Sequence, residues 1–154
     1  MIRITDQYFW NFVFVVFFLI LITMGSIILE TESRILFADL SLTDYILITL
    51  ASWRLTRLFV HDLVTKFFRE QFWDVIKVGK GFQLEKPKTG ARRTIADLLD
   101  CSWCFGIWAT ASVTFFYLTT PYSVFLVVLL ALSAVASFMT NLSRLVSLKI
   151  EEKS

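Results

Sequence analysis

Charged residues are scarce in this sequence. They make up 18% of its 154 residues, whereas a soluble domain usually has about a quarter. Hydrophobic residues make up 56%, and the mean hydropathy is +0.68. This much apolar surface excludes a disordered chain and an ordinary water-soluble enzyme fold. The composition therefore predicts an integral membrane protein.

Cysteine, histidine, proline and glycine are also rare, with two, one, two and five residues respectively. Two cysteines do not make a disulfide framework. The glycines near Lys80 have the wrong spacing for a phosphate-binding loop, and the Ser or Thr of that motif is missing. The sequence also contains no recognisable pair of nucleophile and base. We therefore expect no enzyme activity and no cofactor.

Two uncharged stretches predict membrane crossings. Residues 8–29 form one stretch, which is long enough to cross a hydrocarbon core of about 30 Å. Residues 101–143 form the other, which is about twice that length. Pro121 lies between threonines and a tyrosine near its middle, so we expect two helices, at 101–119 and 122–143, joined by a turn. The first stretch is too long for the apolar part of a signal peptide, and we expect it to be an uncleaved anchor.

A fourth crossing is predicted over residues 42–60, although this segment contains Asp44, Arg54 and Arg57. Asp44 lies where a helix N-terminus favours a carboxylate, and Arg57 lies close enough to the other end to reach the headgroups. The predicted fold is therefore all-α: a four-helix integral membrane bundle, with residues 1–154 as a single membrane domain.

The distribution of charge predicts the orientation. The segment between the first two spans is acidic, whereas residues 61–100 carry eight cations: Lys66, Arg69, Lys77, Lys80, Lys86, Lys88, Arg92 and Arg93. Loops rich in Lys and Arg usually stay on the cytoplasmic side of a membrane. We therefore expect this segment and both termini to be cytoplasmic, in a bacterial inner membrane.

Within the cytoplasmic segment, apolar residues recur at helical spacing over 61–78, which predicts an amphipathic helix. Residues 79–94 are rich in Gly, Lys and Arg, which predicts a flexible basic loop. The cations have two interpretations: attraction to anionic lipid headgroups, or a docking surface for an acidic soluble partner. Direct binding of nucleic acid is not expected, because six acidic residues share the segment.

Buried arginines need counter-charges. Arg54 and Arg57 are three residues apart, so we expect them to share one helix face. Asp97, Asp100 and Asp62 lie at the same predicted membrane boundary, and Arg144 approaches it from the last span. We therefore expect an Arg–Asp network that ties the second, third and fourth spans together.

The pair Cys101 and Cys104 lies at the expected start of the third span, where Asp97 or Asp100 is the expected cap. Three interpretations remain open. The cysteines form a redox pair whose thiolate the helix N-terminus stabilises, or they bind a metal ion together with His61 and Asp62. In the third interpretation, the two cysteines pack as small apolar residues at a contact between helices.

Small and hydroxyl residues recur every four positions in the last two spans: Gly106, Thr110 and Thr114 in one, and Ser133, Ser137 and Asn141 in the other. Such stripes mark helix–helix contacts in lipid. We expect the two stripes to pack together. The alternative is a hydrated path lined by Thr110, Thr114, Ser133 and Ser137.

Two motifs resemble a known family. ASWRLTRL at 51–58, followed by LLDCSWCFG at 98–106, is similar to a family of small bacterial membrane proteins known only as a domain of unknown function. One of its members is associated with sporulation. The resemblance covers about residues 45–140, so the first span is an addition. It implies a bacterial inner-membrane location and no established chemistry.

In size and topology alone, the chain is also similar to the membrane component of Kiwa, a bacterial antiviral system in which a tetraspan protein recruits a cytoplasmic effector. We therefore expect an oligomeric sensor or scaffold that presents residues 61–94 to a soluble partner, in a setting such as antiviral defence. The alternatives are a channel or membrane-permeabilising effector, and a thiol or metal-binding protein of the membrane face.

Overall fold

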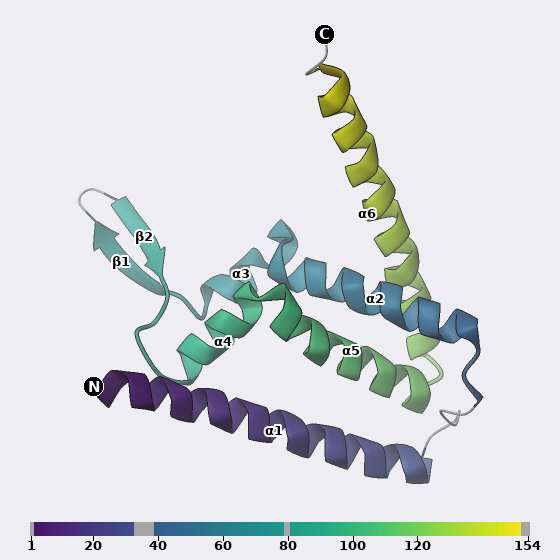
Figure 1. Cartoon of the computed structure of the whole chain (residues 1–154), viewed down its shortest axis with the longest axis horizontal. Coiled ribbons are helices and arrows are strands. Elements are labelled where there is room, and N and C mark those ends of the chain that lie inside the picture. The colour runs from purple at the N-terminus through teal and green to yellow at the C-terminus, as the bar shows by residue number, and fades with distance from the viewer. Residues whose placement is uncertain (1, 33–38, 79–80, 152–154) are drawn as a thin grey trace.

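The computed structural model describes residues 2–32, 39–78 and 81–151, which form six α-helices and one β-hairpin (Figure 1). In chain order the elements are α1 (Ile2–Glu32), α2 (Leu42–Val60), a 3-10 turn (Leu63–Thr65), α3 (Lys66–Glu70), β1 (Asp74–Val78), β2 (Gly81–Glu85), α4 (Ala91–Asp100), α5 (Ser102–Thr119) and α6 (Ser123–Glu151).

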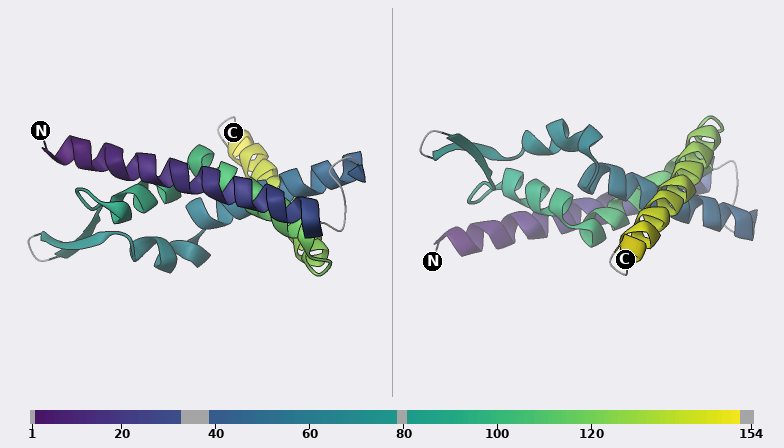
Figure 2. Two further views of the ribbon diagram at one scale, coloured as in Figure 1. Left: turned by 90° about the horizontal axis from the view of Figure 1, so that it is seen from below. Right: turned by 90° about the horizontal axis from the view of Figure 1, so that it is seen from above.

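Helices α1, α2 and α5 run alongside one another, whereas α6 crosses α2 steeply and its C-terminal half projects away from the others (Figures 1 and 2). Helix α2 packs against both α5 and α6. The core lies where these three helices meet, and its buried residues are Ile48, Ala51, Val113, Tyr117, Leu118 and Val127. Helix α1 lies at the edge, against α4 and α5.

The N-terminus of α2 is fixed by a capping box. The backbone N–H of Ser41 donates to Asp44 Oδ2 at 2.9 Å, and the N–H of Asp44 donates to Ser41 Oγ at 3.3 Å. The hydroxyl of Tyr117 donates to the same carboxylate at 2.6 Å, which ties α5 to this end of α2. The placement of Asp44 at a helix N-terminus, predicted from the sequence, is therefore confirmed.

Two helical segments are long and apolar enough to cross a membrane: Gln7–Thr31 in α1 and Ser123–Glu151, which is α6. A third candidate consists of α4 and α5 together, although the two are bent by 91°. The α5–α6 turn contains Pro121, as predicted. By length and composition the described residues thus contain two or three candidate spans, and α2 is not among them because it carries Asp44, Arg54 and Arg57.

The all-α prediction is wrong for the segment after α2. The predicted amphipathic helix over 61–78 is helical only from Leu63 to Glu70, and β1 begins at Asp74. β1 pairs with β2 in antiparallel register, with Val75 opposite Leu84 and Ile76 opposite Gln83. The strand forms because Val75, Ile76 and Val78 are β-branched and favour extended backbone.

The predicted flexible loop over 79–94 is also largely ordered. It contributes β2 and the first turn of α4. Gly90 caps α4 with φ of +98°, a conformation that residues with a Cβ rarely adopt, so glycine is needed there. The result is a small folded unit, which we call the hairpin–α4 unit and define as residues 74–78 and 81–100.

The two small-residue stripes do not pack against each other, because α2 takes that position. A Cβ placed on Gly106 would lie 3.9 Å from Thr56 of α2. Ser133 of α6 accepts a hydrogen bond from Arg54 of α2 at 3.0 Å. Thr114 faces α1, and Asn141 is exposed. The predicted contact between the stripes is therefore wrong.

Candidate functional site

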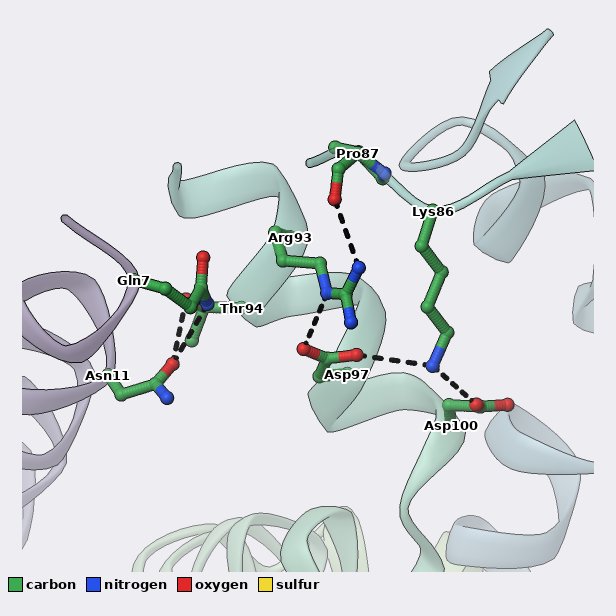
Figure 3. Close-up of polar contacts among 8 residues, drawn as sticks. All are labelled: Gln7, Asn11, Lys86, Pro87, Arg93, Thr94, Asp97 and Asp100. Carbon is green, nitrogen blue, oxygen red and sulfur yellow. Dashed lines mark hydrogen bonds and ion pairs between the residues drawn. The ribbon is translucent and has the colours of Figure 1, made fainter. Parts of the chain in front are cut away.

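A cluster of ion pairs fastens α4 to the segment that follows β2 (Figure 3). Lys86 Nζ lies 3.1 Å from Asp97 Oδ1 and 2.6 Å from Asp100 Oδ2. Arg93 donates from Nε to Asp97 Oδ2 at 2.8 Å and from Nη1 to the carbonyl of Pro87 at 3.2 Å. These contacts hold the hairpin–α4 unit together, since β1 and β2 alone would be only marginally stable.

The cluster has a simple electrostatic cause. Asp97 and Asp100 lie in the last turn of α4, where the helix dipole disfavours negative charge. Lys86 supplies the counter-charge, and its hydrogen bond to Asp100 raises the pKa of its ammonium group against the opposing effect of burial. Burial disfavours the charged form of Asp97, but hydrogen bonds from Arg93 and Lys86 outweigh it, so the pKa of Asp97 lies below its usual range.

These shifts predict how the stability of the hairpin–α4 unit depends on pH. Because the pKa of Asp97 is lowered on folding, its contribution is present above its unfolded value of about 3.9 and is lost as pH falls through the folded value. Because the pKa of Lys86 is raised, its contribution is present below about pH 10.4 and is lost as pH rises through the folded value.

Thermal unfolding of the detergent-solubilised protein across pH tests this prediction. The control is the variant Lys86→Met/Asp97→Asn/Asp100→Asn, which lacks the titrating cluster. We expect the stability difference between the two proteins to be constant between about pH 5 and 9 and to shrink at both extremes. A difference that changes across neutral pH would contradict it.

Three polar side chains join α1 to α4 (Figure 3). Gln7 Nε2 donates to Thr94 Oγ1 at 2.9 Å, and Thr94 Oγ1 donates to Asn11 Oδ1 at 3.1 Å. Thr94 is buried. These residues are not among those predicted from the sequence. The available signal is that Gln7 and Asn11 lie four residues apart, and therefore on one face, at the start of the apolar part of α1.

Half of the cations predicted to form a basic surface are paired with acidic residues of the same chain. Besides Lys86 and Arg93, Arg92 pairs with Asp74 at 3.0 Å, and Lys66 pairs with Glu70 at 3.5 Å. Of the remaining predicted cations, Arg69 donates to the carbonyl of Val60, Lys77 and Lys88 are exposed and form no ion pair with another described residue, and Lys80 lies outside the described residues.

The structure does not show the predicted pairing of Arg54 and Arg57 with Asp97 and Asp100. Arg54 Nη1 lies 2.9 Å from Asp62 Oδ2, and its Nε donates to Ser133 of α6. Asp97 and Asp100 are instead paired within the hairpin–α4 unit. Arg144 is exposed on α6 and pairs with no acidic residue in the described part of the chain.

Arg54 and Arg57 also point to different neighbours. Three residues turn a helix through about 300°, which leaves two side chains about 60° apart. Because helices pack against α2 on more than one side, this angle places the two arginine side chains beside different neighbours. Arg57 lies over the ring of Trp53, 5.4 Å from its centroid, and its Nε is buried without a hydrogen-bond partner among the described residues.

Cys101 caps α5. The prediction that Asp97 or Asp100 would form this cap is therefore wrong. Its Sγ accepts a hydrogen bond from the backbone N–H of Cys104 at 3.2 Å. Cys101 is half-buried and Cys104 is exposed, and both are free thiols. The pair therefore has an observed role in ending α4 and starting α5 at the sharp bend, and the redox interpretation stays a prediction.

The residues proposed for a metal site do not assemble into one. His61 Nε2 lies 3.0 Å from Ser102 Oγ, and Asp62 is occupied by Arg54. In the described part of the chain, no group of three or more His, Cys, Asp or Glu residues is placed to hold a metal ion. Of the residues predicted to line a channel, Thr110 lines a space between α1, α2 and α5, Thr114 faces α1 and Ser133 contacts α2, and the channel itself stays a prediction.

The comparisons with known proteins agree with the two sequence motifs. Residues 47–143 match the family described as "Protein of unknown function (DUF1360)". The chain belongs to this family. The DUF1360 region begins within α2 and ends within α6, so it includes the whole Lys86–Asp97–Asp100 cluster and excludes α1.

The chain is also similar to UPF0713 protein YngL of Bacillus subtilis (strain 168), with 32% identity over 82 residues. The aligned part is 53% of this chain and 63% of that protein, so it spans less than two thirds of the relative. No solved structure matches the chain significantly. The resemblance to a family of unknown function is thus confirmed, whereas the topological similarity to Kiwa stays a prediction.

Proposed function

We propose that this membrane protein is a sensor or scaffold that presents the hairpin–α4 unit to a soluble partner. In this proposal it is a homo-oligomer of the bacterial inner membrane, in which α1, α2, α5 and α6 all cross the bilayer. Both termini and residues 61–100 are cytoplasmic, as the distribution of cations indicates.

The observation that supports this proposal is that the hairpin–α4 unit, which lies between α2 and α5 in the chain, is folded and held by ion pairs among its own residues. The ion pairs of Lys86, Arg92 and Arg93 fix the hairpin–α4 unit, rather than leaving a loose basic loop. A unit that is fixed in shape suits specific protein binding, because little conformational entropy is lost when a partner docks.

Lys77 and Val75 form the centre of the proposed partner surface. They lie two residues apart in β1, so their side chains project from the same face of the hairpin. Val75 is 64% exposed. Together with Lys88, the other exposed cation of the unit that forms no ion pair with a described residue, they would fit a partner that offers acidic groups around an apolar contact.

We assign contact with anionic lipid to a different segment, the turn that follows α2. Leu63, Val64 and Phe67 are 80%, 75% and 68% exposed, and Lys66 lies among them. An exposed apolar cluster beside a cation suits the headgroup layer of a membrane. The cations of the hairpin–α4 unit thus serve partner binding in this proposal, whereas the turn that follows α2 contacts anionic lipid.

Site-specific photo-crosslinking in membranes of the native bacterium tests the partner surface. A photoreactive amino acid at Leu84, which lies opposite Val75 in β2 and is 43% exposed, should yield a discrete adduct with a soluble protein. We expect Lys77→Glu/Lys88→Glu to reduce that adduct about tenfold, because reversing charges at an interface weakens encounter and binding.

The matched control is Arg144→Glu/Lys149→Glu, which changes the net charge equally at exposed positions of α6. It should leave the adduct unchanged. Equal loss in both variants, or no adduct in the unmodified protein, would contradict the proposed surface. Challenging a deletion strain with phage tests the antiviral setting separately.

A further inference from the structure

A long groove runs between α1, α2 and α5. Its volume is about 1320 Å³, which exceeds the 300–1,000 Å³ or so of ordinary small-molecule sites. Apolar side chains from all three helices line it, among them Ile22 of α1, Trp53 of α2 and Ile107 of α5. A groove of this size and character has room for a long apolar ligand.

The length of the groove matches one leaflet of a bilayer. Thr49 and His61 both line it, and they are twelve residues apart along α2. At the rise of an α-helix this separation is about 18 Å, whereas half of a hydrocarbon core is about 15 Å. An acyl chain that enters near His61 would therefore reach the region of Thr49.

The hydroxyl groups that α2 contributes to the groove need no ligand. Thr49, Ser52 and Thr56 each donate to a backbone carbonyl four residues earlier, at 2.7–2.8 Å. Arg57 differs from them. Its buried Nε has no partner in the described part of the chain, and no described acidic residue pairs with its guanidinium. The groove thus combines long apolar walls with one cation that has no counter-charge among the described residues.

We propose that this groove binds one anionic phospholipid, with its phosphate on Arg57 and one acyl chain between α1 and α5. A phosphate oxygen can accept hydrogen bonds from a guanidinium with good geometry, and it cancels a charge that is costly in the membrane.

The end of the groove near Arg57 has the character of a headgroup region. His61 and Ser102 lie there as a hydrogen-bonded pair, and Trp103 beside them is 89% exposed. Indole rings concentrate at the level of lipid headgroups. A soluble anion would not explain the apolar length of the groove, whereas a phospholipid accounts for both the charge and the walls.

Native mass spectrometry tests the proposal. The full chain is reconstituted in nanodiscs that contain equal amounts of phosphatidylglycerol and phosphatidylcholine, and the lipids it retains on release are counted. We expect one retained phosphatidylglycerol, with a preference of about tenfold that Arg57→Gln abolishes, as loss of a charge-assisted hydrogen bond implies. Lys149→Gln removes one exposed cation from α6 and should retain the preference.

A second variant, Ala111→Phe, fills the groove without changing its charge, and it should reduce retention of either lipid. Thermal unfolding identifies any variant that fails to fold. If one of Arg57→Gln and Ala111→Phe fails to fold, the other one tests the proposed lipid site. Equal retention of the two lipids would overturn the assignment of the phosphate to Arg57. Equal loss in Arg57→Gln and Lys149→Gln would show attraction to the bulk membrane and would overturn the site.

Discussion

Replacing Ala51 with leucine is expected to destabilise the folded protein by about 1–3 kcal/mol, the usual range for overpacking. Ala51 is fully buried in the core where α2 meets α5 and α6. Three added carbon atoms at this position would push α2 away from its neighbours. Because helices in lipid associate through close packing and not through removal of apolar surface from water, little else would compensate.

Ala136→Leu is the matched control, because Ala136 is exposed on α6. The added side chain there would face lipid, and we expect no change in stability. Unfolding of the purified proteins by titration with SDS in mixed micelles measures the difference. If both variants unfold at the same SDS fraction, the packing of α2 between its neighbours is not what stabilises the bundle.

Replacing Lys86 with glutamate is expected to have the next largest effect. The change removes both ion pairs of Lys86 and adds a third carboxylate beside Asp97 and Asp100, at the end of α4 where negative charge is already disfavoured. The acidic side chains are 42% and 58% exposed, so solvent screens part of the repulsion. We expect a loss of about 1–2 kcal/mol.

Hydrogen exchange of the amides of α4 and β2 measures this loss locally. Lys88→Glu is the control, because Lys88 is exposed and forms no ion pair with another described residue. Its amide protection should match that of the unmodified protein. The double variant Lys86→Glu/Asp100→Lys restores one ion pair in reverse and should recover part of the stability. No recovery would mean that the cluster does not act through charge.

The long helices could be predicted because their signals are continuous. The uncharged run over 101–143, with a proline-containing turn near its middle, predicts α5, the turn and most of α6. Asp44 marked the first turn of α2. The β-hairpin could not be predicted in this way, because Phe72, Val75 and Ile76 fit a helical period, whereas only Ile76 and Val78 fit an alternating one over so short a segment.

The ionic partners were harder to predict than the charges themselves. Lys86 reaches Asp97 and Asp100 only because the chain folds back after β2, and a segment expected to be a loop offers no such geometry. Likewise, the expectation that consecutive helices pack together placed α5 against α6. Instead, α2 packs against both α5 and α6. This packing depends on the small residues Ala51, Ser52 and Thr56, which were not predicted to lie at a helix contact.

The right-angle bend at Cys101 has a consequence for how far the hairpin–α4 unit extends from the membrane in the proposed arrangement. With α5 upright in the bilayer, a bend of 91° lays α4 parallel to the membrane plane. The hairpin fastened to α4 then lies close to the lipid surface instead of standing above it. Any protein that docks there must itself come within reach of the phospholipids, and a bulky domain would need a flat or concave underside to approach.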